Sequence, residues 1–514
     1  MTRRILPLVL ISVVNFSLVR SAAGQPGWVL AHQKLSDTEG NFAGILDNGD
    51  SFGTSVASLG DLDGDGIVDI AVGAWGDDDG CQDCARGAVW ILFLLRDGTI
   101  KTEQKISDTM GGFTGELDDG DQFGGAVASL GDLDGDQVTD LAVGAISDDD
   151  GGDSRGAVWI LFLRRDGTVK AHQKVSNTRG GFLGTLHDHD LFGSSVAFLG
   201  DLDGDRIGDL AVGAVNDADG GGTRGAVWVL FLNRDGRVKS HQKISATEGG
   251  FNGLIDAYDD FGYSVACLPD LDHDNRNELV VGALRDDDGG DPPGADRGAV
   301  WILMLNHDGT VKAHQKISDT EGGFTGGLQD NDWFGSSVAS PGDLNTDGVA
   351  DIFVGSRLDD DGGRWNRGAV WVLFLLGDGT VKAHQKISAT AGGFKGELSE
   401  SDYFGSSVAP LGDLDGNGVA DVIVGADGDD DGDFDAGAAW VLFLDADLCQ
   451  YRLTKSARSM GGCRSCPIKR DIVESAMSCD RKKSCPKKLK GRINCPDGGP
   501  GACTKIRGRR KACG

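Results

Sequence analysis

Short apolar runs alternate with turns rich in glycine and aspartate along most of the chain. Runs such as Ala126 to Leu130, Val158 to Leu163 and Val169 to Val175 are about as long as a β-strand, and Gly and Asp bound them. The 82 glycines in 514 residues fit tight turns, and an apolar fraction of 39% is enough for a packed core. The pattern therefore predicts an all-β fold.

One unit recurs six times, and each copy contains a Phe-Gly pair followed by four strand-length runs. Four strands per unit are the content of a four-stranded antiparallel blade, so the repeat predicts a β-propeller. A solenoid is the alternative, but it would use shorter units and need capped ends. We expect six blades, with seven as the alternative if a degenerate copy is hidden. The Phe-Gly pairs begin at Phe52, Phe123, Phe192, Phe261, Phe334 and Phe404.

The two ends of the repeat array complement each other. The segment from Trp28 to Ser36 matches the fourth-strand sequence VKAHQKIS, whereas the last copy stops after its third run, Ala438 to Leu444. The N-terminal strand therefore supplies what the last blade lacks. This closes the ring and removes exposed sheet edges. We expect the propeller to occupy residues 24–446.

The chain begins with a pattern typical of a secretory signal peptide. Arg3 and Arg4 precede an apolar run from Ile5 to Val19, and small residues follow as far as Ala23. A membrane anchor is the alternative, but the run is short for one. We expect residues 1–23 to be removed and the protein to be secreted, without a transmembrane segment.

Residues 447–514 form a basic, cysteine-rich tail. From Cys449 onward, 18 Lys and Arg face 4 Asp and Glu. Eight cysteines in a secreted segment predict a disulfide framework whose connectivity stays open; zinc is the alternative, but the segment contains no histidine. The basic runs could bind an anionic polysaccharide or fold back on the propeller, and we expect no nucleic-acid partner. The cysteines are Cys449, Cys463, Cys466, Cys479, Cys485, Cys495, Cys503 and Cys513.

Three further cysteines lie in the repeats. Cys81 and Cys84 could bridge within their loop, whereas Cys267 is expected to be free within a strand.

Without the tail, the chain carries a net charge of −45, which would drive a compact domain apart unless cations neutralised part of it. An acidic nine-residue loop lies between the first and second strand of every unit. Its candidate oxygen ligands stand at positions one, three, five and nine. They are Asp61, Asp63, Asp65 and Asp69; Asp132, Asp134, Asp136 and Asp140; Asp201, Asp203, Asp205 and Asp209; Asp270, Asp272, Asp274 and Glu278; Asp343, Asn345, Asp347 and Asp351; and Asp413, Asp415, Asn417 and Asp421.

Alternate acidic residues turn their side chains toward one centre when such a loop curls. Ca²⁺ accepts six to eight oxygen ligands in irregular geometry, whereas Mg²⁺ prefers a tight octahedron, so Ca²⁺ is the predicted cofactor. A solvated acidic turn is the alternative, because Asp and Gly favour turns in any case. The fourth loop departs most, since His273 and Asn275 replace its glycines.

The Phe-Gly pair, the DxDxDxxxD loop and the following Val-Gly-Ala, as in Val72-Gly73-Ala74, resemble the FG-GAP repeat of integrin α subunits and of related bacterial and algal surface proteins. The resemblance covers about residues 28 to 446. It implies a propeller, calcium in these loops, and a role in adhesion or recognition. This sequence lacks the proline expected after Gly-Ala, and integrin propellers have seven blades.

The resemblance also implies that ligands bind the face opposite the calcium loops. Aspartate runs lie there in the second-to-third loops, at 77–79, 148–150, 286–288, 359–361 and 429–431. They could bind cations or a basic partner, but we expect solvated, disordered runs. The near-identity of the blades argues against an asymmetric pocket.

Two aromatic positions recur in the repeats. The tryptophans Trp90, Trp159, Trp228, Trp301, Trp371 and Trp440 are expected to pack in the core, with sugar stacking as the alternative. The histidines His172, His241, His314 and His384 are expected on the outer-strand surface and not to bind metal.

These features favour a calcium-dependent extracellular recognition module over an enzyme. No blade holds a carboxylate pair, nucleophile or histidine constellation that the other blades lack. A carbohydrate-active enzyme or lectin on a propeller scaffold, and a structural matrix component, are the alternatives. The expected partner is an extracellular protein or polysaccharide.

Overall fold

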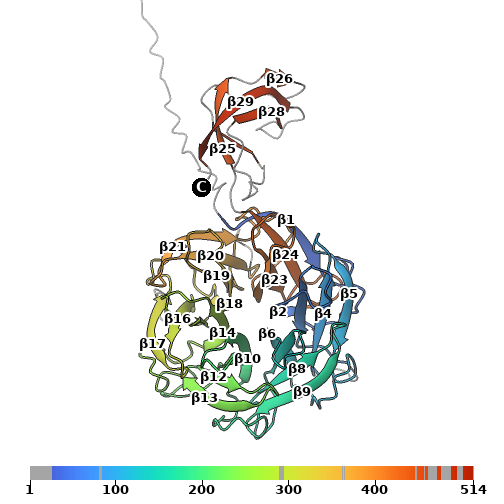
Figure 1. Ribbon diagram of the computed structural model, residues 1–514, viewed down its shortest axis with the longest axis vertical. Helices are drawn as coiled ribbons and strands as arrows, with labels where there is room; N and C mark the ends of the chain where they lie inside the picture. Colours follow the sequence, from blue (N-terminus) through green and yellow to red (C-terminus); the bar gives the residue numbers. More distant parts are fainter. Residues whose placement is uncertain are drawn as a thin grey trace, which may run out of the picture. The chain divides into compact units, whose positions relative to one another are not determined.

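The computed structural model describes residues 26–79, 84–288, 295–361, 363 and 365–445, and the backbone of five strands beyond them. Every regular element of the described residues is a β-strand. The repeats form four-stranded antiparallel sheets arranged around a ring, with the first strand of each sheet nearest the centre and the fourth at the rim (Figure 1). The protein is therefore an all-β, six-bladed propeller, as predicted, and the seven-bladed alternative is wrong.

Each of the first five blades consists of four strands that are consecutive in the chain, and the sixth combines the last three repeat strands with the first strand of the chain. Blade one contains β2 (Phe52–Gly60), β3 (Asp69–Ala74), β4 (Ala88–Leu94) and β5 (Ile100–Ile106); blade two β6 (Phe123–Gly131), β7 (Asp140–Ala145), β8 (Ala157–Leu163) and β9 (Val169–Ser176); blade three β10 (Phe192–Gly200), β11 (Asp209–Ala214), β12 (Ala226–Leu232) and β13 (Val238–Ile244); blade four β14 (Phe261–Leu268), β15 (Glu278–Ala283), β16 (Ala299–Leu305) and β17 (Val311–Ile317); blade five β18 (Phe334–Gly342), β19 (Asp351–Ser356), β20 (Ala369–Leu375) and β21 (Val381–Ile387); blade six β22 (Val408–Gly412), β23 (Asp421–Ala426), β24 (Ala438–Asp445) and β1 (Trp28–Leu35).

The ring closes through the predicted exchange of a strand. β1 pairs antiparallel with β24, in a register that runs from Trp28 opposite Asp445 to Leu35 opposite Ala439. Segments more than 400 residues apart in the chain thus share one sheet, drawn in blue and orange in Figure 1. β24 therefore has a hydrogen-bonded strand on both sides, and the two ends of the propeller are joined in one blade.

The core lies between the blades. Each of six apolar clusters joins residues of two neighbouring blades; one of them packs Leu59 and Ile91 of blade one with Val127 and Trp159 of blade two. Third strands such as β8 are buried along their whole length, since a neighbouring blade covers each face. The repeated tryptophans are 3% to 6% exposed, which confirms that they pack in the core.

The structure shows why the Phe-Gly pair, at the inner ends of the blades, contains a glycine. Gly53 adopts φ +95, and a Cβ atom there would lie 2.2 Å from the carbonyl oxygen of Ala438. Only glycine allows this close approach of neighbouring blades. The Ser55 hydroxyl then donates a hydrogen bond of 2.7 Å to the carbonyl oxygen of Gly124 in the next blade. The pair therefore marks the point where inner strands are joined.

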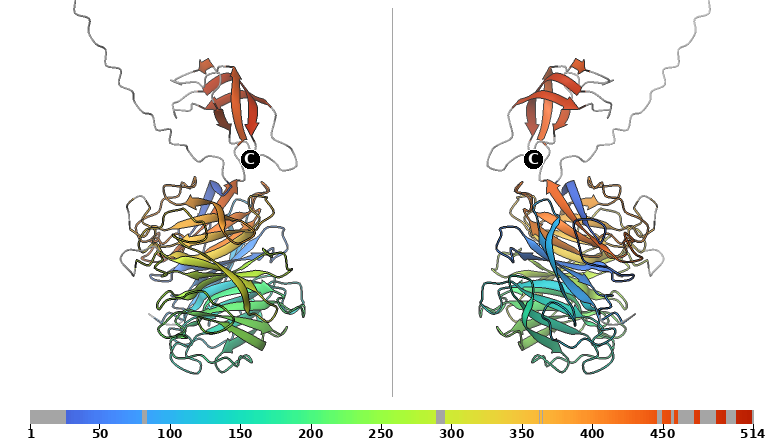
Figure 2. Two further views of the ribbon diagram at one scale, coloured as in Figure 1. Left: turned by 90° about the vertical axis from the view of Figure 1, so that its left-hand side faces the viewer. Right: turned by 90° about the vertical axis from the view of Figure 1, so that its right-hand side faces the viewer.

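The tail contains a separate sheet, shown in red in Figure 2. It consists of β25 (Cys449–Lys455), β26 (Arg458–Met460), β27 (Ile472–Ser475), β28 (Lys488–Asn494) and β29 (Ala502–Ala512), with strand order β26-β29-β25-β27 and β28 paired with β29. The predicted signal peptide, the tail disulfides and the tail's polysaccharide-binding side chains all lie outside the described residues.

The other three cysteines belong to the repeats. Cys84 is disulfide-bonded, and Cys81 lies outside the described residues. Cys267 is free, as predicted, and lies in β14, where burial raises the pKa of its thiol to about 12. Among the described residues, no helix is long and apolar enough to cross a membrane.

Candidate metal centres and the opposite face

The acidic loops connect the first and second strand of each blade at one face of the propeller. Position one follows the end of the first strand, as Asp61 follows Gly60, and position nine opens the second strand, as Asp69 does. In five of the six loops, at least three of the predicted carboxylates bring an oxygen within 4.8 Å of the others. These groups are Asp61, Asp63 and Asp69; Asp132, Asp134 and Asp136; Asp201, Asp203 and Asp209; Asp270, Asp272, Asp274 and Glu278; and Asp413, Asp415 and Asp421.

The loop backbone turns these side chains inward. In blade one, the Asp61 carboxylate accepts hydrogen bonds from the amides of Gly64 (2.8 Å) and Gly66 (2.9 Å). The Asp63 and Asp65 carboxylates each accept one from the amide two residues later. The same pattern in blades two and three means that the acidic spacing itself defines the loop conformation.

The carboxylate at position nine is the buried member of each loop. In blade one, Asp69 accepts hydrogen bonds from the amides of Leu62 (2.9 Å) and Leu94 (3.2 Å). Burial is the main cause that raises the pKa of this carboxyl, because a buried charge loses its hydration. The pKa rises to about 6 at Asp69 and Asp140 and to about 7 at Asp209, Glu278, Asp351 and Asp421. A cation at the loop would favour the ionised form.

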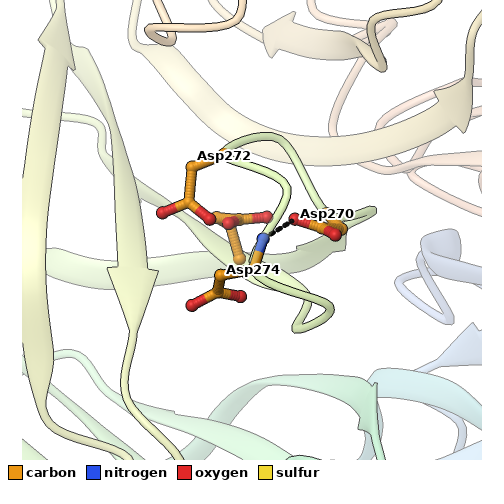
Figure 3. A group of neighbouring side chains, drawn as sticks. Asp270, Asp272 and Asp274 are labelled. Atoms are coloured by element: carbon orange, nitrogen blue, oxygen red, sulfur yellow. Dashed lines mark hydrogen bonds between the residues drawn. The ribbon is translucent and has the colours of Figure 1, made fainter.

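The fourth loop departs most in sequence, yet it gathers all four of its carboxylates. His273 and Asn275 adopt φ values of 64° and 67°, so both take the left-handed conformation that glycine has in other loops. Figure 3 shows Asp270, Asp272 and Asp274 around the loop, with the amide of Asp274 donating to Asp270 (3.0 Å). The loss of both glycines therefore leaves the site geometry intact.

The fifth loop is the weaker one instead. Among the described residues, its three predicted carboxylates, Asp343, Asp347 and Asp351, do not bring their oxygens within 4.8 Å of one another, and its fourth predicted ligand is the amide Asn345. The Asn345 side-chain oxygen accepts the amide of Asp347 (2.9 Å), and its Nδ2 points to Asp351 (3.5 Å). An amide at position three thus supplies less negative charge than the aspartate of the other loops.

The donor sets fit Ca²⁺. They consist of carboxylate oxygens, with one Asn side-chain oxygen each in loops five and six. Such hard oxygen ligands in irregular geometry suit Ca²⁺ better than Mg²⁺ or zinc.

A lysine that sequence reasoning missed reaches each of the first five loops. It is the second residue of the fourth strand, and in blade one the Lys101 ammonium lies 2.7 Å from both Asp63 and Asp65. We call these residues the loop lysines: Lys101, Lys170, Lys239, Lys312 and Lys382. The sequence signal for this contact was the repeated fourth-strand pattern VKAHQK, in which two lysines flank half-buried residues.

On the opposite face, the aspartate runs are ordered parts of buried ion pairs, so the expectation of solvated, disordered runs at 77–79, 148–150, 286–288, 359–361 and 429–431 is wrong. In blade one, Asp77 is 2% exposed and lies 2.6 Å from the Lys105 ammonium, which also lies 2.9 Å from Asp79. Six lysines are held in this way, five of them 6% to 9% exposed and Lys386 19%, and we call them the buried lysines. Their pairs are Lys34 with Asp429 and Asp431, Lys105 with Asp77 and Asp79, Lys174 with Asp148 and Asp150, Lys243 with Asp217 and Asp219, Lys316 with Asp286 and Asp288, and Lys386 with Asp359 and Asp361.

Aromatic rings complete these buried clusters. The Lys174 ammonium lies 5.2 Å from the ring of Trp159, close enough for a cation–π interaction. His172 lies on the outer strand as expected, but it is half-buried, with its ring 5.3 Å from Trp159 and 5.1 Å from Phe113. Burial lowers the pKa of His172, so the neutral ring is favoured.

A second carboxylate lies near each buried pair. Asp121 is 3% exposed and accepts the amide of Asp118 (2.9 Å). Burial, followed by repulsion from Asp148, raises its pKa to about 7. Burial raises the pKa to about 7 at Asp50, Asp259, Asp332 and Asp402 as well.

The mouth of the central channel differs from blade to blade, contrary to the expectation that near-identical blades would leave no asymmetric pocket. A cavity of about 350 Å³ opens there, at the end of the inner strands away from the acidic loops. The residue that follows the second strand lines it from five blades. These residues are Trp75, Ile146, Val215, Arg357 and Asp427.

Three polar groups make one side of this cavity distinct. The Arg357 guanidinium donates to the Asp427 carboxylate at 3.2 Å and lies 4.8 Å from the ring of Tyr403. Tyr263, also from the lining, lies 3.4 Å from the Arg357 guanidinium. The opposite wall, from blades one to three, is mainly apolar.

Comparisons with known proteins agree with the repeat. The FG-GAP repeat family matches residues 52–92 and 404–442. Integrin alpha-5 of Xenopus laevis is 32% identical over 263 residues, which cover 51% of this chain and 22% of that protein. Integrin alpha-2 of Mus musculus is 31% identical over 265 residues, covering 50% and 19%. The matched region is thus about a fifth of the length of these relatives.

One solved structure, of BBS1N in complex with ARL6DN, aligns with 95% of this chain and 98% of that chain. The identity is 11% and the TM-score 0.36, and this likeness supports no inference.

Proposed function

We propose that this integrin-α-like FG-GAP repeat protein is a secreted, calcium-binding recognition module that binds an extracellular protein or polysaccharide through the face opposite its acidic loops. The observation that carries the proposal is the channel mouth. Blades that repeat one another almost residue for residue differ there, as the change from Trp75 to Arg357 and Asp427 at one repeat position illustrates. A single binding site on a scaffold of repeats requires some blades to differ, whereas scaffold positions do not.

The cavity has the properties of a small binding site. Its volume of about 350 Å³ lies within the range of ligand pockets, and it combines an apolar wall with a few convergent polar groups. A side chain or sugar of a larger partner could enter it while the surrounding loops contact the rest of that partner.

The acidic loops support the calcium part of the proposal. They group carboxylate oxygens at the other face and carry much of the negative charge of the propeller. The resemblance to integrin α subunits favours adhesion or recognition over catalysis. Bound Ca²⁺ would hold each loop, and with it the ends of the first and second strands that the loop joins, in one conformation.

An array of extracellular proteins and glycans, probed with the full chain in Ca²⁺ and in chelator, tests the proposal. We expect capture that requires Ca²⁺ and weakens at least tenfold in Trp75→Ala or Arg357→Ser. Leu183→Ser changes a loop residue that is 87% exposed and lies outside the cavity, so it serves as the matched control. Depolymerised glycan, or capture unchanged by both channel variants, would contradict the proposal.

A further inference from the structure

The loop lysines occupy the same place in five blades. In blade two, the Lys170 ammonium lies 2.8 Å from Asp134 and also contacts Asp136. Lys239 lies 2.9 Å from Asp203, and Lys312 lies 2.8 Å from Asp272. In each case the lysine binds the carboxylates at positions three and five, which are predicted metal ligands. The fifth blade keeps one contact, Lys382 to Asp347 at 2.6 Å.

Strand register identifies the corresponding residue of blade six. In blade one, Lys101 is the bulged residue between the pairs Leu94 with Ile100 and Phe93 with Thr102. In blade six, the bulge between the pairs Leu444 with Val29 and Phe443 with Ala31 is Leu30, whose side chain is 45% exposed. The loop of blade six therefore faces an uncharged side chain where the others face an ammonium group.

The loop of blade six also lacks the aspartate at position five, which is the second partner of the lysine in blades one to four. Position five is Asn417, and its amide nitrogen donates to Asp415 (3.1 Å) and to the carbonyl oxygen of Leu444 (2.9 Å). Four carboxylates and one ammonium in blades one and two thus carry the same net charge as three carboxylates in blade six, whereas the loops of blades three and four also contain Arg206 and Arg276. What differs is whether a cation already holds the ligand oxygens.

We propose that the loop lysines are tethered cations that compete with Ca²⁺ for the loops of blades one to five, so that the loop of blade six binds Ca²⁺ most tightly. This inference rests on the proposed calcium binding. In the first four blades the ion must displace the ammonium from two ligand carboxylates, and in the fifth from one, or tolerate it nearby. A single charge about 5 Å from a divalent ion costs on the order of tenfold in affinity even at the dielectric constant of water. The loop of blade six has no such cost.

The net charge alone does not predict this order. Counting carboxylates would rank the first four loops, with four each, above the sixth, with three. It would also rank the fifth loop level with the sixth, although Asn345 leaves Lys382 in contact with one ligand carboxylate there. Competition ranks blade six first, blades one to four next, and blade five last, because blade five combines a lysine with the fewest charged ligands.

Calorimetric titration of Ca²⁺ into the full chain, stripped with chelator beforehand, tests the proposal. We expect one site about tenfold tighter than the rest. Leu30→Lys should remove it, whereas Leu30→Met, which adds no charge, should keep it. Asp415→Asn should also remove the tight site, which places it in blade six.

The reverse change should create a second tight site. Lys101→Met is expected to add one, and Lys395→Met, at an exposed lysine between β21 and β22, is the control that should not. Lys101→Gln gives the same test if the methionine variant folds poorly, and the chelator-dependent shift in melting temperature reports on binding independently.

Two results would overturn the inference while the calcium proposal stands: sites of equal affinity that Leu30→Lys and Lys101→Met leave unchanged, or a tight site that survives Asp415→Asn. Absence of Ca²⁺ binding in every variant would instead contradict the proposed function itself, so the two failures are distinguishable.

Discussion

In each of the first four blades the fourth strand carries two lysines that each pair with two aspartates, and the two clusters differ in environment. In β9, Lys170 and Lys174 lie four residues apart, and each ammonium contacts two aspartates. Lys170 is 21% exposed and its partner Asp136 41%, whereas Lys174 is 9% exposed and Asp148 2%. The first cluster lies in water at the acidic loop, and the second lies in the core against Trp159.

The difference shows that burial, not composition, decides what an ion pair contributes. An exposed pair gains little, because water and salt screen it. A buried pair is favourable compared with a single buried charge that has no partner. Removing only one member of the pair is therefore costly. Further hydrogen bonds hold the buried cluster in place: the Ser176 hydroxyl donates to Asp150 (3.0 Å), and the Asp150 amide donates to Asp148 (2.9 Å). The exposed cluster is the one at which we propose that a metal ion competes with the lysine.

Lys174→Met is expected to give the largest effect. It leaves the buried Asp148 carboxylate without its cation, so the free energy of unfolding should fall by about 3–5 kcal/mol. Thermal and urea unfolding in chelator measure this loss. If Lys174→Met is no worse than the same substitution at Lys170, the distinction between the two clusters is wrong.

Neutralising the stranded carboxylate should restore part of that loss. The double variant Lys174→Met with Asp148→Asn is expected to be about 1–3 kcal/mol more stable than Lys174→Met alone, because the uncompensated charge is gone. The same unfolding experiments measure the coupling. Strictly additive effects of the two substitutions would show that Lys174 and Asp148 do not act as a pair.

The carboxylates beside the buried clusters predict a pH dependence. The pKa of Asp121 is raised to about 7, from about 4 in an unfolded chain, so the folded protein binds its proton more tightly. Stability from this group is therefore present at low pH and is lost as the pH rises through 7. We expect the melting temperature in chelator to fall between pH 5 and pH 8.

Asp121→Asn should flatten that pH dependence. At pH 8 the variant is expected to be about 1 kcal/mol more stable than the parent, because it lacks the charge that Asp148 repels and that burial disfavours. At pH 4 the two proteins should be alike. A melting temperature that rises from pH 5 to pH 8 would contradict the assigned direction.

The smallest effect is expected for Lys170→Met in chelator. Its side chain is 21% exposed and that of Asp134 27%, so water reaches this pair and the free energy of unfolding should change by less than about 1 kcal/mol. The matched comparison with Lys174→Met on the same strand excludes a general effect of placing methionine in β9. A loss of several kcal/mol would show that the loop lysines are structural and not replaceable by an ion.

Sequence reasoning predicted the propeller well because its signals are local or periodic. The spacing of Phe52, Phe123 and their counterparts predicts the blades, and the match between Trp28–Ser36 and the fourth strands predicts the closure. The loop ligands were identified for the same reason, since Asp61 and Asp63 are neighbours in the chain. That these loops bind metal ions stays a prediction, whereas the structure shows the carboxylates grouped in five of the loops.

The errors concern residues whose partners are distant in the chain. Asp148 reads as part of a solvated run until Lys174, 26 residues later, is placed beside it with Trp159. The channel mouth brings Tyr263, Arg357 and Asp427 together from three blades, although each occupies a variable position within its own repeat.

The sequence by itself thus determined the strands, the number of blades, the ring closure and the acidic loops of this protein, because hydrophobic alternation and repeat spacing act along the chain. Tertiary structure alone decided which aspartates are buried, which lysines neutralise them, and what lines the central channel. Burial and electrostatic pairing depend on neighbours in space, and in a closed ring those neighbours come from other strands and other blades.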